Sequence, residues 1–246
     1  METEHFQIYN EDCFDTFKRI KDKSLNLVIV DLPYGQTKCK WDIIIPFDKM
    51  WDELKRIIKP NANLLFFCST KFGIELINSN PKWFRYDIVW EKTRPIGFLN
   101  ANRSILRNHE MIYLFGKPSG GKKIYNPQMT KGNPYKKKGE GKKDGKIYSD
   151  NLIYLNKNNK GVRYPVSVQK FPNPNNHSYH PTQKPLDLYE WLIKTFSNEG
   201  DLVCDFCLGS GTGLFASLKT NRKFIGCELN KDYFDKILIN LKNKID

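Results

Sequence analysis

The chain has 246 residues and a mass of 28.9 kDa, the length of one large domain or of one domain with an insert. Forty Lys and Arg residues oppose 27 Asp and Glu, so the formal net charge is +13 and the pI is near 9.3. The length excludes a disulfide-stapled miniprotein, and a hydrophobic content of 39% with 13% aromatic residues excludes a generally disordered chain. The charge points to a polyanionic partner such as nucleic acid.

The sequence suggests neither a membrane segment nor a metal site. Residues 1–12 are acidic and lack the basic region and apolar run of a secretory signal. No apolar run approaches the ~20 residues needed to cross a bilayer. The six cysteines lie mostly inside or beside apolar strand-like runs, as in a reducing cytoplasm. Cys204 and Cys207 form an isolated CxxC pair, whereas a zinc site would need a second pair or well-spaced histidines. We therefore expect a cytoplasmic protein that binds no metal.

Strands and helices are expected to alternate along two blocks of the chain. The predicted strands span residues 6–9, 25–30, 64–68, 86–90, 111–115, 202–206 and 224–227. The predicted helices span residues 14–20, 47–58, 72–77, 186–196 and 212–219, with a last helix from Tyr233. This alternation predicts a doubly wound, mostly parallel, seven-stranded α/β sheet that binds its ligands at the carboxyl ends of the strands.

A basic region separates the two blocks. From Lys117 to His180, fourteen basic residues oppose three acidic ones, a net charge of +11 that leaves about +2 for the rest of the chain. The region is rich in Gly, Asn and Pro, which marks a loop-rich insert, and tyrosines lie among its lysines, which suits base stacking together with phosphate contact. We interpret residues 117–179 as a nucleic-acid-binding insert, although a solvated loop is the simpler alternative. The candidate DNA-binding residues are Lys136, Lys137, Lys138, Lys142 and Lys143.

A glycine-rich motif, DFCLGSGTG at residues 205–213, follows one predicted strand and opens a helix. Closely spaced glycines let the backbone turn tightly and approach a ligand. A dinucleotide-binding GxGxxG pattern would need glycine where Leu214 stands, and the lysine of a phosphate-binding loop is absent. Glu228 ends the next strand, where its carboxylate could accept hydrogen bonds from a ribose. A tight turn and a surface glutamate remain the alternative.

Two further motifs lie near strand and helix ends. DLPYG, residues 31–35, follows a strand and brings a carboxylate, two carbonyls and an aromatic ring into one turn, which could bind an amino group on a heterocycle. A plain turn filled by an aromatic ring is the alternative. HPTQKP, residues 180–185, precedes a predicted helix, and Pro185 suits a first helical turn, so this motif alone says little.

Taken in order, DLPYG, the basic insert, HPTQKP and DFCLGSGTG resemble the S-adenosylmethionine-dependent amino-methyltransferases of DNA, specifically the permuted beta class. That family carries DPPY, a target-recognition insert, HPTQKP and DPFxGSGT in the same order. Residues 12–14 resemble its adenine-pocket segment, and residues 87–117 resemble its later strand region. The likeness covers most of the chain outside the insert. Leu32 replaces the family's first proline, and Phe206-Cys207 replaces its Pro-Phe.

The resemblance implies a Rossmann-like methyltransferase fold with a catalytic half at residues 1–116, a target-recognition insert at 117–179 and a cofactor-binding half at 180–246. S-adenosylmethionine is the implied cofactor. Its implied binding residues are Asp12, Cys13, Phe14, Thr182, Lys184, Asp205, Phe206, Leu208, Gly209, Ser210, Gly211, Thr212 and Glu228.

The implied reaction is methylation of the exocyclic N6 amine of a flipped-out adenine in double-stranded DNA, with Asp31, Leu32, Pro33 and Tyr34 as the catalytic residues. Within the family an initial Asp in this motif leans to adenine and an initial Ser to cytosine. N4-cytosine methylation and a catalytically inactive DNA-binding relative are the alternatives. The resemblance allows a homodimer and a cognate restriction endonuclease as partners without deciding either, and the sequence does not give the recognition site.

Overall fold

A computed structural model describes residues 1–36, 42–136, 158–174 and 183–245 of the chain. It forms two compact units, one made of Met1–Asn126 with Ser167–Asp246 and the other of Pro127–Val166. The helices of the larger unit are α1 (Cys13–Arg19), α2 (Phe47–Ile57), α3 (Thr70–Ser79), α4 (Leu186–Phe196), α5 (Thr212–Lys219) and α6 (Lys231–Ile245). Its strands are β1 (Phe6–Tyr9), β2 (Leu25–Asp31), β3 (Ile58–Cys68), β4 (Phe84–Ile96), β5 (Arg107–Phe115), β10 (Val168–Phe171), β11 (Leu202–Asp205) and β12 (Lys223–Cys227).

These strands form a single sheet in the order β1-β12-β11-β2-β3-β5-β4-β10. The first five strands of that order are parallel, β5 is antiparallel to both of its neighbours, and β10 is parallel to β4. The carboxyl ends of β1, β2, β3, β4, β11 and β12 therefore lie along one edge of the sheet. The predicted doubly wound, mostly parallel α/β sheet is confirmed.

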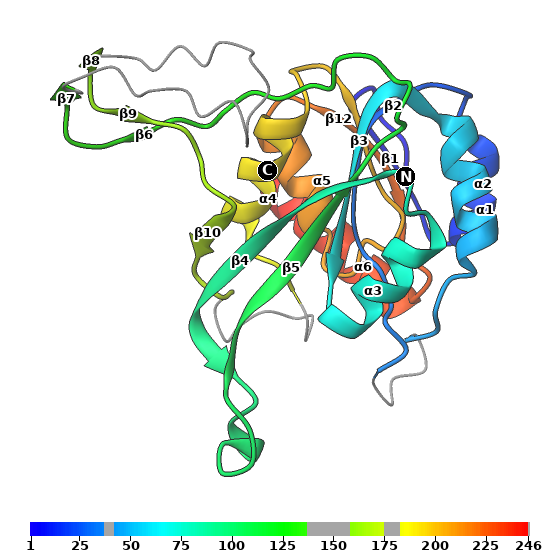
Figure 1. Cartoon of the computed structure of the whole chain (residues 1–246). Helices are drawn as coiled ribbons and strands as arrows, with labels where there is room; N and C mark the ends of the chain where they lie inside the picture. The colour runs from blue at the N-terminus through cyan, green and yellow to red at the C-terminus, as the bar shows by residue number, and fades with distance from the viewer. Residues whose placement is uncertain (37–41, 137–157, 175–182, 246) are drawn as a thin grey trace. The chain divides into compact units, whose positions relative to one another are not determined.

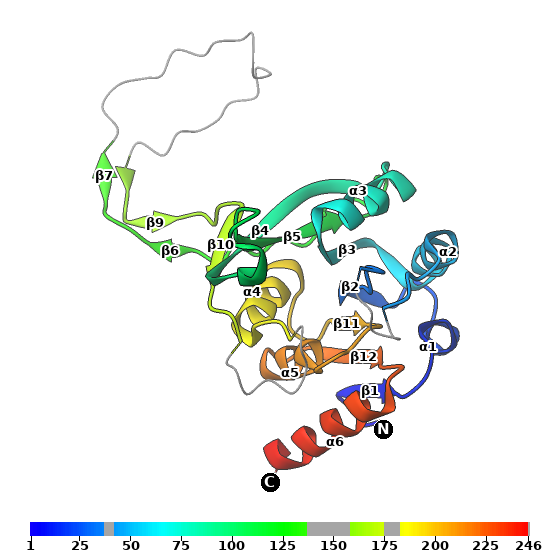
Figure 2. The ribbon, with the colours of Figure 1, turned by 90° about the horizontal axis from the view of Figure 1, so that it is seen from below.

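Helices cover both faces of this sheet (Figures 1 and 2). Side chains of α1, α2 and α3 pack on one face with Val28 and Val30, and those of α4, α5 and α6 pack on the other face with Leu27 and Ile29. Neighbouring residues of β2 thus point to opposite faces, and both faces are buried, which explains the continuous apolar run of this strand. No helix among the described residues is long and apolar enough to span a membrane.

The sheet departs from the prediction at one edge. The described residues form eight strands in it rather than the predicted seven, because Val168–Phe171 pairs with β4. This short stretch lies inside the predicted insert, and its alternation of exposed and half-buried residues gives too weak an apolar signal to identify a strand. Strands β4 and β5 also run further than predicted and continue as a hairpin whose loop contains the short 3-10 helix η1 (Phe98–Asn100).

The smaller unit has two short antiparallel ladders. They join β6 (Thr130–Lys131) to β9 (Val162–Arg163) and β7 (Tyr135–Lys136) to β8 (Asn158–Asn159). The Arg163 guanidinium lies 4.9 Å from the centre of the Tyr135 ring. This unit falls wholly within the insert that the sequence predicts at residues 117–179, and its compact part is shorter than that prediction.

Candidate active site

The DLPYG and glycine-rich motifs meet at the edge where the parallel strands end. Asp31 is the last residue of β2. The neighbouring strand β11 ends at Asp205. A cavity of about 950 Å³ opens at this edge. It is lined by the predicted residues Asp12, Cys13, Phe14, Asp31, Leu32, Pro33, Tyr34, Lys184, Phe206, Leu208, Gly209, Ser210, Thr212 and Glu228. The structure therefore gathers most of the predicted site residues around one cavity.

Asp42 fixes the backbone at the end of the DLPYG motif. Its two carboxylate oxygens accept hydrogen bonds from the N–H groups of Gly35 and Gln36, each at 2.8 Å. Leu32, which replaces the family's proline, buries its side chain in the core. Here core packing and the Asp42 carboxylate constrain a loop that has one proline fewer than the family pattern.

The Asp31 carboxylate lies in a chain of charged side chains. One oxygen accepts a 2.7 Å hydrogen bond from the Tyr34 hydroxyl, and the other lies 2.6 Å from Nζ of Lys184. Lys184 Nζ is also 2.9 Å from a Glu110 oxygen, and the other oxygen of Glu110 is 2.9 Å from Nζ of Lys92. Two carboxylates and two ammonium groups thus alternate and balance their charges beside the cavity.

Burial and this alternation set the protonation states. Burial raises the pKa of Asp31, and Lys184 opposes part of that rise. For Glu110, burial would raise the pKa, but Lys184 and Lys92 bring it below its ordinary value. Burial would lower the pKa of Lys184, yet Asp31 and Glu110 together raise it. Lys184 therefore stays charged and favours the ionised form of Asp31, the form that accepts hydrogen bonds from an amine.

The glycine-rich turn forms the opposite part of the cavity. Gly209 and Gly211 both have positive φ, of 53° and 76°, which is a conformation that favours glycine. Glu228 accepts hydrogen bonds from the N–H groups of Gly209 at 2.7 Å and Asn230 at 2.8 Å, one on each oxygen. Each oxygen keeps a second lone pair, so Glu228 can hold the turn and still accept a ligand hydroxyl.

Two predicted cofactor-binding residues do not line the cavity. Asp205 and Gly211 are absent from the cavity lining, and Asp205 accepts a 3.0 Å hydrogen bond from the N–H of Cys207. Burial raises the pKa of Asp205 to about 8. Phe206 lines the cavity but also packs edge-on against Phe17, with ring centres 5.0 Å apart. The aromatic ring at position 206 thus joins the turn to α1.

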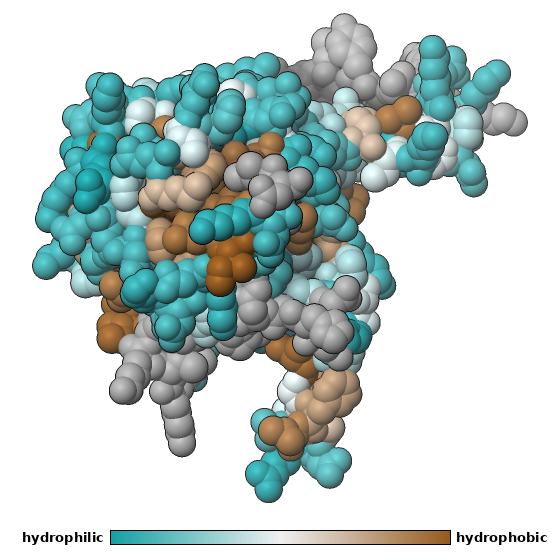
Figure 3. Space-filling model, turned by 180° about the vertical axis from the view of Figure 1, so that it is seen from behind, coloured by the Kyte–Doolittle hydropathy of each residue, from teal (hydrophilic) through white to brown (hydrophobic). Residues whose placement is uncertain are grey.

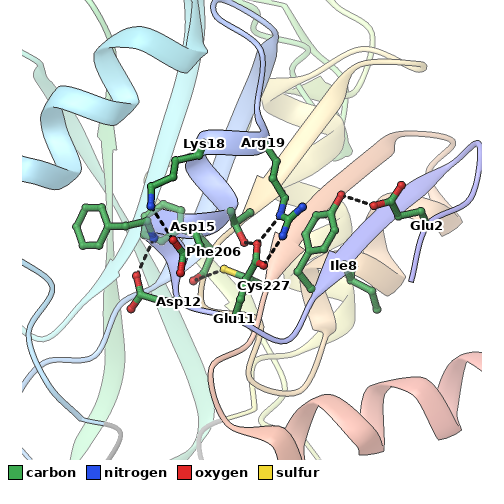
Figure 4. Close-up of polar contacts among 12 residues, drawn as sticks. Glu2, Ile8, Glu11, Asp12, Asp15, Lys18, Arg19, Phe206 and Cys227 are labelled. Carbon is green, nitrogen blue, oxygen red and sulfur yellow. Dashed lines mark hydrogen bonds and ion pairs between the residues drawn. The ribbon is translucent and has the colours of Figure 1, made fainter.

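The start of α1 supplies the far wall of the cavity. Asp12 caps this helix by accepting a 2.8 Å hydrogen bond from the N–H of Phe14. Arg19 forms a paired hydrogen bond to Glu11, whose carboxylate also accepts from Thr16 (Figure 4). These contacts fix the loop between β1 and α1 and the first turn of the helix, where residues 12–14 line the cavity.

Four cavity or loop residues were missed by sequence reasoning, namely Asp42, Lys92, Glu110 and Gln183. Glu110 carried a signal, because it is a charged residue directly before the apolar run of β5. Gln183 lines the cavity, and its Oε1 is buried with no hydrogen-bond partner among the described residues. A buried acceptor without a partner is costly unless a ligand donates to it. The amino group of S-adenosylmethionine is such a donor, so this cavity fits the predicted cofactor.

Several predicted residues lie outside the part of the chain that the structure describes. These are Thr182, Lys137, Lys138, Lys142 and Lys143. Lys136 is exposed at the end of β7. The five described cysteines are free thiols, and no group of His, Cys, Asp and Glu within the described ranges could hold a metal ion.

Comparison with known proteins gives consistent matches along the chain. Residues 25–240 match the family model described as DNA methylase, N6_N4_Mtase. The Type II methyltransferase M1.MboII of Moraxella bovis is 28% identical over 94% of this chain and 94% of its own length. The structure of the M1.HpyAVI–SAM complex has a TM-score of 0.63 and 25% identity, covering 96% of this chain and 99% of that one. The cytosine-N4-specific PvuII DNA methyltransferase has a TM-score of 0.69 at 14% identity, over 96% and 86% of the two chains, which shows a shared fold.

Proposed function

Since this chain belongs to the DNA methylase family of N6/N4 enzymes, we propose that it transfers the methyl group of S-adenosylmethionine to the N6 amine of a flipped-out adenine in double-stranded DNA. The observation that carries the proposal is the position of Asp31. Its carboxylate lies on a cavity that also reaches the glycine-rich turn and Glu228. One cavity thus has room for both a nucleoside-containing cofactor and an extruded base.

The cofactor would be held at the glycine-rich end. Glu228 would accept hydrogen bonds from the ribose, the segment at residues 12–14 would border the adenine, and Gln183 Oε1 would accept from the amino group of the methionine end. The ammonium group of Lys184 pairs with Asp31 and Glu110, so we place Lys184 beside the catalytic carboxylate. When bound, S-adenosylmethionine supplies an electrophilic methyl group.

Asp31 would activate the amine. The lone pair of an exocyclic amine is delocalised into its ring, so the amine is a poor nucleophile. When the Asp31 carboxylate and the carbonyl oxygen of Leu32 or Pro33 accept its two N–H bonds, the lone pair becomes localised on nitrogen and can attack the methyl carbon in line. The methylated amine then carries one excess proton, which Asp31 is placed to accept or pass to water.

Tyr34 would hold the base in place. Its ring lies against Phe72, with centres 4.9 Å apart, and its hydroxyl binds Asp31. A ring fixed at both ends can stack on an extruded base without losing much conformational freedom. Extrusion of the base from the duplex costs a few kcal/mol, and stacking on Tyr34 offsets part of that cost.

The choice of adenine rests on the initial Asp of the motif, and the experiment must distinguish it from cytosine. The protein should be expressed in a methylation-deficient bacterial host, and the genomic DNA digested to nucleosides for mass spectrometry. N6-methyladenine is the expected product. N4-methylcytosine would overturn the base assignment, and unmodified DNA would overturn the enzymatic function. Modification-sensitive sequencing of the same DNA would return the recognition site.

A further inference from the structure

The loop of the β4–β5 hairpin carries apolar side chains that the larger unit leaves in solvent. Leu99 and Ile105 are 102% and 98% exposed, the highest values among the large hydrophobic residues of the described chain, and Phe98 is 64% exposed. Figure 3 shows brown apolar side chains on this projecting hairpin. Exposed apolar side chains gathered at one projecting tip usually mark a contact with a partner.

The hairpin has a defined backbone and a defined position. β4 and β5 stay paired as far as Ile96 and Arg107. Beyond them, the N–H of Asn100 bonds to the carbonyl of Gly97, and that of Arg103 to the carbonyl of Asn100. The base of the hairpin forms one side of the active-site cavity, because Arg94, Ile96 and Arg107 line it together with Asp31. The exposed tip therefore stands at the mouth of the cavity that the target base must enter.

Charge identifies the partner. Residues 92–109 contain no Asp or Glu; Lys92 is paired with Glu110 at the base of the hairpin, and the other charged residues are Arg94, Arg103 and Arg107. A second copy of this chain docked symmetrically through the hairpin would bring these like charges together, which is unfavourable. A DNA duplex offers phosphates to the arginines and stacked bases to the apolar tip.

We propose that the β4–β5 hairpin is a DNA-contacting wedge, with Leu99 and Ile105 entering the duplex where the target base leaves it and Arg103 bound to a neighbouring phosphate. Extrusion of a base leaves a gap in the stack, and inserted Leu, Ile or Phe side chains are known to fill such gaps in DNA. This inference rests on the proposed function, and it assigns DNA contact to the catalytic unit in addition to the basic insert.

The test uses the double variant Leu99→Ala/Ile105→Ala of the full-length protein, with Ile74→Ala/Ile239→Ala as a control that removes exposed isoleucines from α3 and α6. Methyl transfer is measured on a duplex carrying the recognition site and on the same duplex with the base opposite the target removed. We expect the hairpin variant to lose about tenfold or more in kcat/KM on the paired duplex and to recover most of it on the abasic one, where extrusion is easier. The control should match the wild type on both, and the thermal midpoints of all three proteins should agree.

Equal activity of hairpin variant and wild type on the paired duplex would overturn the inference. So would an equal loss on both duplexes, because a wedge acts only on extrusion. Sedimentation of the wild type and the variant shows whether the hairpin instead joins two copies; dissociation of a wild-type dimer in the variant would also overturn it. Failure of the proposed function looks different, since the wild type itself would then transfer no methyl group to DNA.

Discussion

At the scale of single residues, the site is organised around a carboxylate whose charge depends on its neighbours. Asp31 ends a buried strand, where burial favours its neutral form, and Lys184 opposes that effect from 2.6 Å. Glu110 and Lys92 complete the chain of charges. The sequence motifs predicted Asp31 as catalytic and Lys184 as cofactor-binding. The pairing of Lys184 with Asp31 could not be predicted, because the spacing of HPTQKP does not show which strand its lysine faces.

Lys184→Met should shift the pH dependence of the reaction. Without the ammonium group, only the hydrogen bond from Tyr34 opposes burial and Glu110, and the pKa of Asp31 rises. Catalysis requires the ionised form, so the acidic limb of the profile of kcat/KM against pH should move to higher pH. Lys194→Met, which removes a half-exposed lysine from helix α4 just after Lys184, is the control. Superimposable profiles for Lys184→Met and the wild type would refute this role.

Asp205→Asn should flatten the dependence of stability on pH. The carboxyl ionises near pH 4 in the unfolded chain but at about 8 in the folded one. Between these values the unfolded state releases the proton more readily, so this group makes the fold progressively less stable as the pH rises from 4 to 8. Asparagine keeps an acceptor for the N–H of Cys207. In urea unfolding, the variant should gain stability relative to the wild type between pH 5 and 8. A constant difference across that range would contradict this reasoning.

At the scale of elements, the sequence predicted the buried parts best. Strand β2 and helices α4 and α5 are found within a residue of the expected bounds, because each has a clear apolar period or run. The prediction failed where polar residues form strands, in β10 and in the outer parts of β4 and β5. There, pairing with a neighbouring strand decides the conformation, and the local sequence pattern does not predict that pairing.

Gly226→Ala tests the close packing of β11 against β12. A Cβ at this position would lie 2.1 Å from the carbonyl oxygen of Asp205. Since both atoms belong to paired strands, the backbone must shift, and we expect a loss of about 2–4 kcal/mol in the free energy of unfolding. Lys223→Ala, at the exposed start of the same strand, should change it little. Denaturant unfolding measures both, and equal stabilities would show that the strands separate without cost.

At the scale of the whole molecule, the net charge of +13 is unevenly divided, with +11 in the stretch from Lys117 to His180. The compact unit Pro127–Val166 lies within this stretch. Which bases the insert reads does not follow from composition, since base contacts depend on the position of individual side chains. The basic hairpin was not predicted, because its three arginines are too few to stand out in the sequence.

Replacing Lys136, Lys137 and Lys138 by alanine should weaken DNA binding and flatten its salt dependence. Each lost phosphate contact should reduce the slope of log K against log salt by about 0.9. Lys21→Ala/Lys49→Ala, which removes exposed lysines of the larger unit, is the control. Fluorescence anisotropy at several salt concentrations gives the slopes, and an unchanged slope would identify the lysine run as a solvated loop.

The central claim is that the Asp31 carboxylate activates the amine of a DNA base toward the methyl group of S-adenosylmethionine. The most direct test compares incorporation of radiolabelled methyl into site-containing DNA by the wild type and by Asp31→Ala, with S-adenosylmethionine binding followed by calorimetry. We predict no detectable transfer by the variant and binding of the cofactor by both proteins. Transfer by Asp31→Ala at the rate of the wild type would contradict the account.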